Sequence, residues 1–251
     1  MKKCIIYANC QRGLLERYLL KSDFVKYYQI IPTWPVQFKN KNNLDPETLS
    51  SVDLFIYQNV SDVFGHEFSS AAILSQLKPS CEKILFPSIF FNTYWPQHVK
   101  QPIVRPLREL NNMAGGLFPH GDSNIIRLMQ SGASLEKIIT TLSDDDFYSE
   151  SEVMDSVSKS FRELKRRETE QHVDINISDY IYNNLQNNFL MHTINHPSCF
   201  VGIYAVKQIL KILNIEHNNF DTPYTTDKHR LESLTRFDCE TPIYPSVIRW
   251  L

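Results

Sequence analysis

Glycine is scarce in this chain of 251 residues: there are only 7, and no two of them are spaced as Gly-x-Gly. This excludes the glycine-rich fingerprint with which dinucleotide-binding domains hold a pyrophosphate. Gly116 and Gly121 have the separation found in the phosphate-binding P-loop, but Asp122 occupies the position that requires a lysine. The common nucleotide-binding motifs are therefore absent.

Long hydrophobic runs and a surplus of positive charge are also missing. No segment approaches the roughly 18 apolar residues of a membrane span, and the first apolar run is too short for a signal peptide. The 26 Lys and Arg against 28 Asp and Glu give a net charge of -2, which argues against a dedicated nucleic-acid binder. We expect a cytoplasmic protein with neither a membrane span nor a nucleic-acid partner.

Cysteine is the third sparse residue type. The 5 cysteines are odd in number and form no Cys-x-x-Cys pair, so they predict neither a disulfide framework nor a zinc site. His192 and His196 have the spacing of a metal pair on a helix, but Pro197 and the apolar residues before it predict a strand and a turn there. We expect no metal, and a reducing compartment.

The first twenty residues, MKKCIIYANCQRGLLERYLL, are the most informative stretch. The apolar run over residues 4–8 predicts a strand, and the spacing of apolar residues after position 13 predicts an amphipathic helix. Cys10 lies where the strand turns into the helix, the place where open α/β sheets present ligand-binding groups. The helix N-terminus and nearby N–H groups should favour the thiolate. The alternative is a buried cysteine that acts as a small hydrophobic residue.

Strand and helix signals alternate through the first hundred residues, which is typical of a parallel sheet with helices on both faces. The predicted strands cover residues 3–8, 28–31, 54–57 and 83–86, with helices at 11–21 and 67–77. Helical signals dominate from 105 to 187, with Asp122 or Ser123 and Ser134 as N-caps. We expect an α/β fold with a mostly parallel sheet and three layers, as in flavodoxin-like proteins. Residues 1–104 and 188–251 would form the core, and residues 105–187 a helical subdomain or cap, in one compact unit.

His196 is the best candidate for a base that serves Cys10. It lies in a second predicted strand-to-helix junction, where Pro197 suits the first helical position, and such junctions gather at the carboxyl edge of a doubly wound sheet. A Cys–His pair can carry acyl chemistry, with Asn9 and N–H groups at the start of the first helix as an oxyanion hole. Gln58, after the third strand, should point to the same edge. His196 can equally be an ordinary loop histidine.

Other polar segments allow two interpretations. Gly121-Asp122-Ser123 resembles the start of a lipase motif, but a helix cap is the favoured interpretation; His120, Asp122 and Tyr94 can still line a cleft. The acidic residues 144–146 precede a helix and need no metal. The basic residues 165–167 can bind a phosphate, but a solvated helix face is the favoured interpretation. The aromatic-rich residues 86–96 can line a sugar or acyl-donor site, or pack onto the core.

Several of these short elements together resemble one family. The elements are Asn9-Cys10-Gln11, Gln58, the aromatic-rich residues 87–96, Asn195-His196-Pro197 and the closing Pro242…Tyr244-Pro245. They are similar to the WcbI family of bacterial capsular polysaccharide biosynthesis proteins, which are viewed as coenzyme A-binding acetyltransferases. The resemblance implies an α/β core distantly similar to the SGNH hydrolases. Cys10 would take the place of the hydrolase serine and His196 that of the base, with the third triad member undefined.

The resulting hypothesis is an O-acetyltransferase that moves an acetyl group from acetyl-CoA to a sugar hydroxyl of a surface polysaccharide or its precursor. The chain could associate with other polysaccharide biosynthesis proteins. Cys10 and His196 would be catalytic, and Asn9, Gln11, Gln58 and Asn195 would be oxyanion or substrate ligands. Arg12, Arg105 and Arg108 are the candidates for the coenzyme A phosphates. The alternatives are an SGNH-like esterase or deacetylase with the same Cys–His pair, and a non-catalytic accessory protein that binds coenzyme A or glycan.

Overall fold

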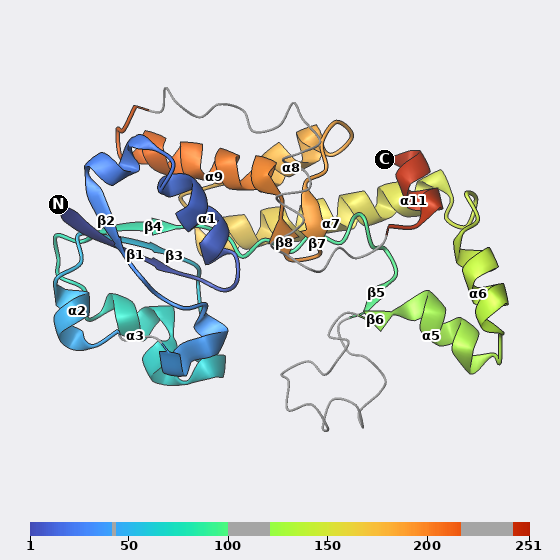
Figure 1. Ribbon diagram of the computed structural model, residues 1–251, viewed down its shortest axis with the longest axis horizontal. Helices are drawn as coiled ribbons and strands as arrows, with labels where there is room; N and C mark the ends of the chain where they lie inside the picture. Colours follow the sequence, from blue (N-terminus) through green and yellow to red (C-terminus); the bar gives the residue numbers. More distant parts are fainter. Residues whose placement is uncertain (42–43, 100–120, 217–242) are drawn as a thin grey trace. The chain divides into compact units, whose positions relative to one another are not determined.

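A computed structural model of the chain describes residues 1–41, 44–99, 121–216 and 243–251 (Figure 1). The chain divides into two compact units. The first comprises the described parts of Met1–Phe91 and Phe161–Thr241, and the second those of Asn92–Ser160 and Pro242–Leu251. Within the described ranges, no helix is long and apolar enough to cross a membrane.

The first unit is built on a parallel sheet of four strands in the order β2-β1-β3-β4. Each strand confirms a predicted one, within one or two residues at its ends. The strands are β1 (Lys2–Tyr7), β2 (Tyr28–Ile31), β3 (Leu54–Tyr57) and β4 (Glu82–Leu85). Residues 4–8, at the end of β1 and just beyond it, are fully buried, as expected of a central parallel strand that is covered on both faces.

Helices cover both faces of this sheet (Figure 1). Helices α1 and α9 lie on one face, and α2 and α3 on the other. Their bounds are α1 (Arg12–Leu19), α2 (Pro46–Ser50), α3 (Ser70–Leu74) and α9 (Cys199–Ile212). The face under α2 and α3 carries a core that includes Ile5, Phe55 and Ile73. The predicted α/β class with three layers is confirmed.

Short 3-10 turns complete the connections between these elements. They are η1 (Asp23–Lys26), η2 (Val36–Lys41), η3 (Asp62–Phe64) and η4 (His66–Phe68). The helix predicted over 67–77 is therefore shorter than expected. Ser69 ends η4 in an extended conformation and caps α3 by accepting a hydrogen bond from the Ala72 N–H.

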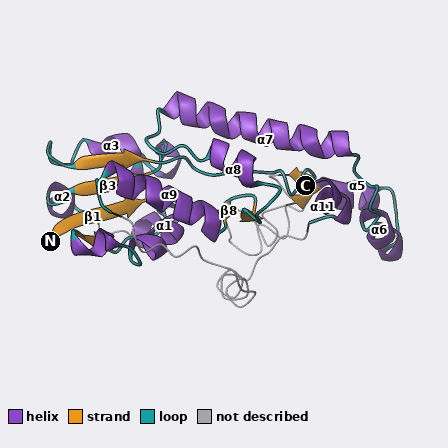
Figure 2. Cartoon of the chain, turned by 90° about the horizontal axis from the view of Figure 1, so that it is seen from above, coloured by secondary structure: helices purple, strands orange, loops and turns teal. Residues whose placement is uncertain are grey.

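The helical signals predicted from 105 to 187 include the charged helix α7 (Glu150–Gln171), seen from above in Figure 2. It is followed by α8 (Ser178–Asn184). The described part of the second unit contains the beginning of α7, a short antiparallel pair of β5 (His98–Val99) and β6 (Gly121–Asp122), and the helices α5 (Ser123–Gln130), α6 (Leu135–Leu142) and α11 (Pro245–Trp250). Asp122 caps α5 and Ser134 caps α6, as predicted.

The strand predicted before His196 forms, but it does not join the parallel sheet, so the expected junction at the carboxyl edge of that sheet was wrong. β7 (Met191–Thr193) pairs antiparallel with β8 (His196–Pro197) in a separate two-stranded ribbon. Pro197 is therefore a strand residue and not the first residue of a helix. The Ser198 N–H donates to the Leu190 carbonyl at 2.8 Å, which holds the ribbon closed, and α9 begins only at Cys199.

The boundaries of the two units differ from the predicted division at 104 and 187. Helix α7 is continuous over 22 residues and crosses the boundary at 160/161. The last helix, α11, belongs to the second unit because Tyr244 donates to the Asp122 carboxylate at 2.6 Å and Trp250 Nε1 to the Tyr148 carbonyl at 3.1 Å. These contacts join residues more than a hundred positions apart, which local patterns do not reveal.

Candidate functional site

The strand order places the predicted site at the topological switch point of the sheet. From β1 the chain crosses outward to β2, and from β3 it crosses in the other direction to β4. The crevice beyond the carboxyl ends of β1 and β3 is where such sheets bind ligands. Asn9, Cys10 and Gln11 follow β1, and Gln58 follows β3. The structure therefore brings these four predicted residues together.

Cys10 lies directly before Gln11, the N-cap of α1, and its side chain is half-buried. The Asn195 side chain donates to Cys10 Sγ with 3.9 Å between Nδ2 and Sγ. In the described part of the chain this hydrogen bond comes from Asn195 and not from His196. A direct contact between Cys10 and His196 stays a prediction.

Thr193 links that amide to His196. Thr193 Oγ1 lies 3.0 Å from Asn195 Oδ1 and 2.7 Å from His196 Nδ1. With Nδ2 turned toward Cys10, Oδ1 can only accept, so the single hydroxyl proton of Thr193 goes to it. His196 Nδ1 then donates to Thr193 Oγ1, and the imidazole lone pair lies on Nε2. This holds for the neutral imidazole, and a role of His196 as a general base stays a prediction.

Burial raises the pKa of the Cys10 thiol above its ordinary value, and this outweighs the backbone N–H groups of Cys10 and Gln11, which lower it. The predicted preference for the thiolate was therefore wrong in its net direction. The N–H effect exists, but a half-buried thiol loses more by desolvation of its charged form than it gains from these donors.

The buried side chains of Gln11 and Gln58 form hydrogen bonds to each other and to the loops around Cys10. Gln11 Oε1 accepts from Gln58 Nε2 at 2.8 Å and from the Ile89 N–H at 3.0 Å, while Gln11 Nε2 donates to the carbonyls of Ile89 and Asn195. Gln58 Oε1 accepts from the Asn9 N–H at 3.1 Å. Both glutamines are at most 3 % exposed. In this structure they fix the loops around Cys10, and a direct contact with substrate stays a prediction.

Asn9 completes this set of hydrogen bonds. Its Oδ1 accepts from the Gln11 N–H at 2.9 Å, which shapes the turn between β1 and α1, and its Nδ2 donates to Ser88 Oγ at 3.0 Å. Ser88 and Ile89 of the aromatic-rich residues 86–96 thus contact the site through serine and backbone atoms. Of the aromatic side chains in this segment, Phe86, Phe91, Tyr94 and Trp95 are buried and Phe90 is 40 % exposed, which favours core packing over a sugar platform.

Arg12, the nearest candidate for a phosphate ligand, is largely buried. Its side chain is 11 % exposed and forms an ion pair with Glu16, with 2.9 Å between Nη2 and Oε2. Its role in phosphate binding stays a prediction. Arg105, Arg108 and His120 lie outside the described residues.

Tyr94 and Asp122, predicted for a cleft, belong to the second unit. Tyr94 is 5 % exposed. Asp122 caps α5 through Oδ1 and accepts from Tyr244 through Oδ2. The cap interpretation of Asp122 is confirmed, and their part in a cleft stays a prediction.

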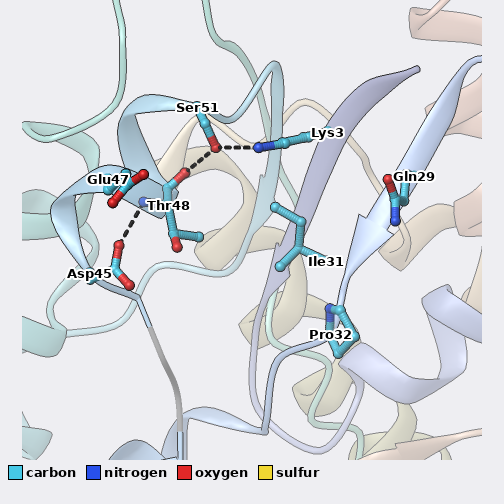
Figure 3. A pocket seen from close by; sticks show the side chains of 8 residues that line it. All are labelled: Lys3, Gln29, Ile31, Pro32, Asp45, Glu47, Thr48 and Ser51. Carbon is cyan, nitrogen blue, oxygen red and sulfur yellow. Dashed lines mark hydrogen bonds between the residues drawn. The ribbon is translucent and has the colours of Figure 1, made fainter.

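A separate pocket of about 510 Å³ lies beside the edge strand β2 and helix α2 (Figure 3). Lys3 Nζ donates to Ser51 Oγ there at 3.1 Å, and Asp45 caps α2. None of the predicted site residues that the structure describes lines this pocket. Elsewhere in the described ranges, no group of three or more His, Cys, Asp or Glu is placed to hold a metal ion.

Sequence reasoning missed Thr193 and Ser88. Both follow or end a strand and carry a hydroxyl, but such residues are common in turns, so no local signal distinguished them. Their importance comes from partners that fold next to them, His196 in one case and Asn9 in the other.

Together, the parallel sheet, the covering helices and the site at the switch point define a doubly wound α/β protein with its polar residues at the carboxyl edge. The family model described as the polysaccharide biosynthesis enzyme WcbI matches residues 3–218. The chain belongs to this family of polysaccharide biosynthesis enzymes.

A solved structure has the same fold, with a TM-score of 0.82 and 19% sequence identity over 100% of this chain and 79% of that one. It is described as WcbI, a novel polysaccharide biosynthesis enzyme, in the native form without a disulfide bond between coenzyme A and one of its cysteines. At this identity, the likeness shows the fold. A comparison with curated proteins gave no match.

Proposed function

We propose that this protein is an O-acetyltransferase that moves an acetyl group from acetyl-CoA to a sugar hydroxyl in the synthesis of a bacterial capsule or surface polysaccharide. The observation that carries the proposal is the hydrogen-bonded series Cys10–Asn195–Thr193–His196 at the switch point of the sheet. It joins a half-buried thiol to an imidazole whose Nε2 carries the lone pair, within a family of polysaccharide biosynthesis enzymes.

Coenzyme A enters this proposal through the related structure, which is described as the native form without a disulfide bond between coenzyme A and one of its cysteines. Such a bond requires the coenzyme A sulfur to reach a cysteine sulfur. Among the cysteines that the structure describes here, Cys4, Cys81 and Cys199 are buried and Cys10 is not. We therefore assign Cys10 to the thioester end of acetyl-CoA.

The raised pKa of Cys10 favours direct transfer over an acyl-cysteine intermediate, because a neutral thiol is a weak nucleophile. In the proposed step, His196 Nε2 takes the proton of the sugar hydroxyl while the hydroxyl oxygen attacks the thioester carbonyl carbon. The carbon–sulfur bond then breaks, and the imidazolium returns its proton to the coenzyme A thiolate. The acetyl group ends on the sugar oxygen.

Two helices begin close to this point and favour the negative charge that develops on the carbonyl oxygen. Helix α1 begins two residues after Cys10, and α9 begins four residues after Asn195. Their N-terminal ends carry partial positive charge, and N–H groups at such an end can stabilise an oxyanion.

The substrate partner is then a sugar or polysaccharide precursor, and association with other proteins of that synthesis is part of the proposal. The described cysteines are free thiols, which fits a reducing compartment such as the cytoplasm.

The test begins with calorimetric titration of the protein with coenzyme A and acetyl-CoA. Micromolar binding that weakens in Cys10→Leu, whose bulkier side chain would occupy the place of the thioester, is the expected result. Coenzyme A release and acetyl incorporation are then measured with a panel of capsular oligosaccharides. His196→Ala should abolish transfer and retain binding, whereas His66→Ala, an exposed histidine, should change neither.

Other outcomes favour the alternatives. Acetyl-ester hydrolysis without any need for coenzyme A would support the esterase, and tight binding with no turnover on any acceptor would support the accessory protein. Absence of coenzyme A binding would remove the acetyltransferase proposal.

A further inference from the structure

Three consecutive basic residues on α7 have different surroundings. Arg166 is an exposed residue that pairs with Glu163 and Glu170, and the Lys165 ammonium pairs with Asp179. Arg167 does not lie on a solvated helix face, as was predicted for residues 165–167. Its side chain is only 18 % exposed, and burial lowers the pKa of its guanidinium.

The Arg167 guanidinium binds two backbone carbonyls in the segment that contacts the Cys10 turn. Nη1 donates to the Ser88 carbonyl at 2.7 Å, and Nη2 donates to the Phe90 carbonyl at 3.1 Å. The guanidinium also lies over the Phe90 ring, with 5.8 Å between its central carbon and the ring centre. The Arg167 guanidinium therefore binds the backbone carbonyls on both sides of Ile89.

The residues held by Arg167 bind both neighbours of Cys10. The Ile89 N–H and carbonyl contact the Gln11 side chain at 3.0 and 2.7 Å. Ser88 Oγ accepts from Asn9 Nδ2 at 3.0 Å. Two short hydrogen-bonded routes thus run from one guanidinium to the residues before and after the thiol.

Burying a guanidinium is costly unless its donors are satisfied. A solvated arginine would avoid this cost, as Arg166 does one position earlier. The two planar donor groups of Arg167 match two carbonyls that are two residues apart, a geometry that the single ammonium of lysine does not reproduce. The Arg167 guanidinium therefore fixes the position of residues 88–90 more firmly than a single hydrogen bond would.

We propose that Arg167 is a positioning residue that holds residues 88–90 against the Asn9–Gln11 turn and thereby keeps Cys10 shielded and aimed at the bound thioester. The role at the thioester rests on the proposed function; the coupling between Arg167 and Cys10 does not. Without the Arg167 hydrogen bonds, residues 88–90 are held less firmly against Asn9 and Gln11, and the Cys10 sulfur becomes more exposed.

The test compares Arg167→Met, Arg167→Lys and the matched control Arg166→Met. Each protein is treated with iodoacetamide at one pH, and alkylation of Cys10 is followed by mass spectrometry. The tryptic peptide of residues 4–12 also contains the buried Cys4, whose alkylation reports general unfolding. Fragment ions separate the two cysteines, so the ratio of their rates removes the effect of lower stability.

Arg167→Met should raise the Cys10 to Cys4 alkylation ratio about 3- to 10-fold, the equivalent of losing one or two net hydrogen bonds. Arg167→Lys should restore part of the wild-type ratio, and Arg166→Met should leave it unchanged. An unchanged ratio in Arg167→Met would overturn the proposal. If Arg167→Met does not fold, the Arg167→Lys variant tests the proposal. Its ammonium can replace only one of the two donor groups, so its Cys10 to Cys4 alkylation ratio must still exceed that of wild type.

Coenzyme A titration of the same proteins separates this proposal from the proposed function. If wild type binds coenzyme A, Arg167→Met should weaken that binding several-fold while Arg166→Met does not. If wild type does not bind it, the acetyltransferase proposal fails, and the alkylation ratio still decides whether Arg167 positions Cys10.

Discussion

The side-chain amide of Asn195 donates to the sulfur of Cys10, with 3.9 Å between Nδ2 and Sγ. The two residues are 185 positions apart in the chain and are brought together by the pairing of α1 with α9 and by the Gln11–Asn195 hydrogen bond. An amide donor supports negative charge on sulfur but does not accept a proton. The proposed function therefore assigns the base to His196, which follows Asn195 in the chain.

The first prediction concerns the titration of Cys10. Because burial raises the pKa of this thiol, its alkylation by iodoacetamide in the free protein should have a midpoint above pH 9. Asn195→Leu removes the donor to sulfur and should move the midpoint further up, slowing the reaction at pH 8 by about 3- to 10-fold. A midpoint near pH 7 in the wild type would contradict the burial effect and would favour an acyl-cysteine intermediate.

Thr193 should be needed for turnover but not for coenzyme A binding. Thr193→Val keeps the shape and removes the hydroxyl that holds His196 Nδ1, so we expect kcat to fall about 10- to 100-fold, as for the loss of about 1.5–3 kcal/mol. Thr193→Ser, which retains the hydroxyl, is the matched control and should retain most of the rate. Steady-state kinetics with calorimetric binding separate the two effects. Equal rates in Thr193→Val and Thr193→Ser would exclude this role.

Gly202 should be required for the close approach of α1 and α9. A Cβ atom at this position would lie 2.7 Å from Leu14 Cγ, so Gly202→Ala must displace the Leu14 side chain. We expect the free energy of unfolding to fall by about 1–3 kcal/mol, the usual cost of overpacking. Urea denaturation measures this change. Gly132→Ala is not a suitable control for the Gly202 variant, because Gly132 has a positive φ.

The control for that prediction is the double variant. Leu14→Ala removes the atoms that the new methyl group would meet, so the cost of Gly202→Ala should be smaller in that background. Fully additive effects would mean that the two helices adjust elsewhere and that the contact at Gly202 is not limiting.

Cys199 should make the fold sensitive to alkaline pH. Burial raises the pKa of its thiol from 9.0 to about 11 in the folded protein. The unfolded chain therefore loses this proton first, and the contribution of Cys199 to stability is complete below pH 9 and is lost as the pH rises to about 11. Thermal unfolding at pH 8 to 11 should show a falling midpoint, with a shallower fall in Cys199→Ala. Parallel curves for the two proteins would contradict the assignment.

Local pattern was sufficient for the sheet and for the position of Cys10. The apolar run over residues 4–8, which contains most of β1, ends in polar residues, and the amphipathic spacing after Gly13 defines α1, so the strand-to-helix turn could be located without its partners. Asp122 and Ser134 were found as helix caps because the residue that accepts a helix N–H is next to that helix in the chain. These signals are short-range, and the sequence carries them directly.

Partners distant in sequence were decided only by the tertiary structure. Hydrophobic periodicity could not show that residues 191–197 form a ribbon of their own, because an edge pairing and a place in the sheet have the same local pattern. The direction of the Cys10 pKa shift was missed because the burial of a thiol depends on residues that are distant in sequence, such as Asn195. The importance of Thr193 and Arg167 came from the same source: a hydroxyl and a guanidinium acquire their roles from the atoms that folding places within 3 Å or so of them.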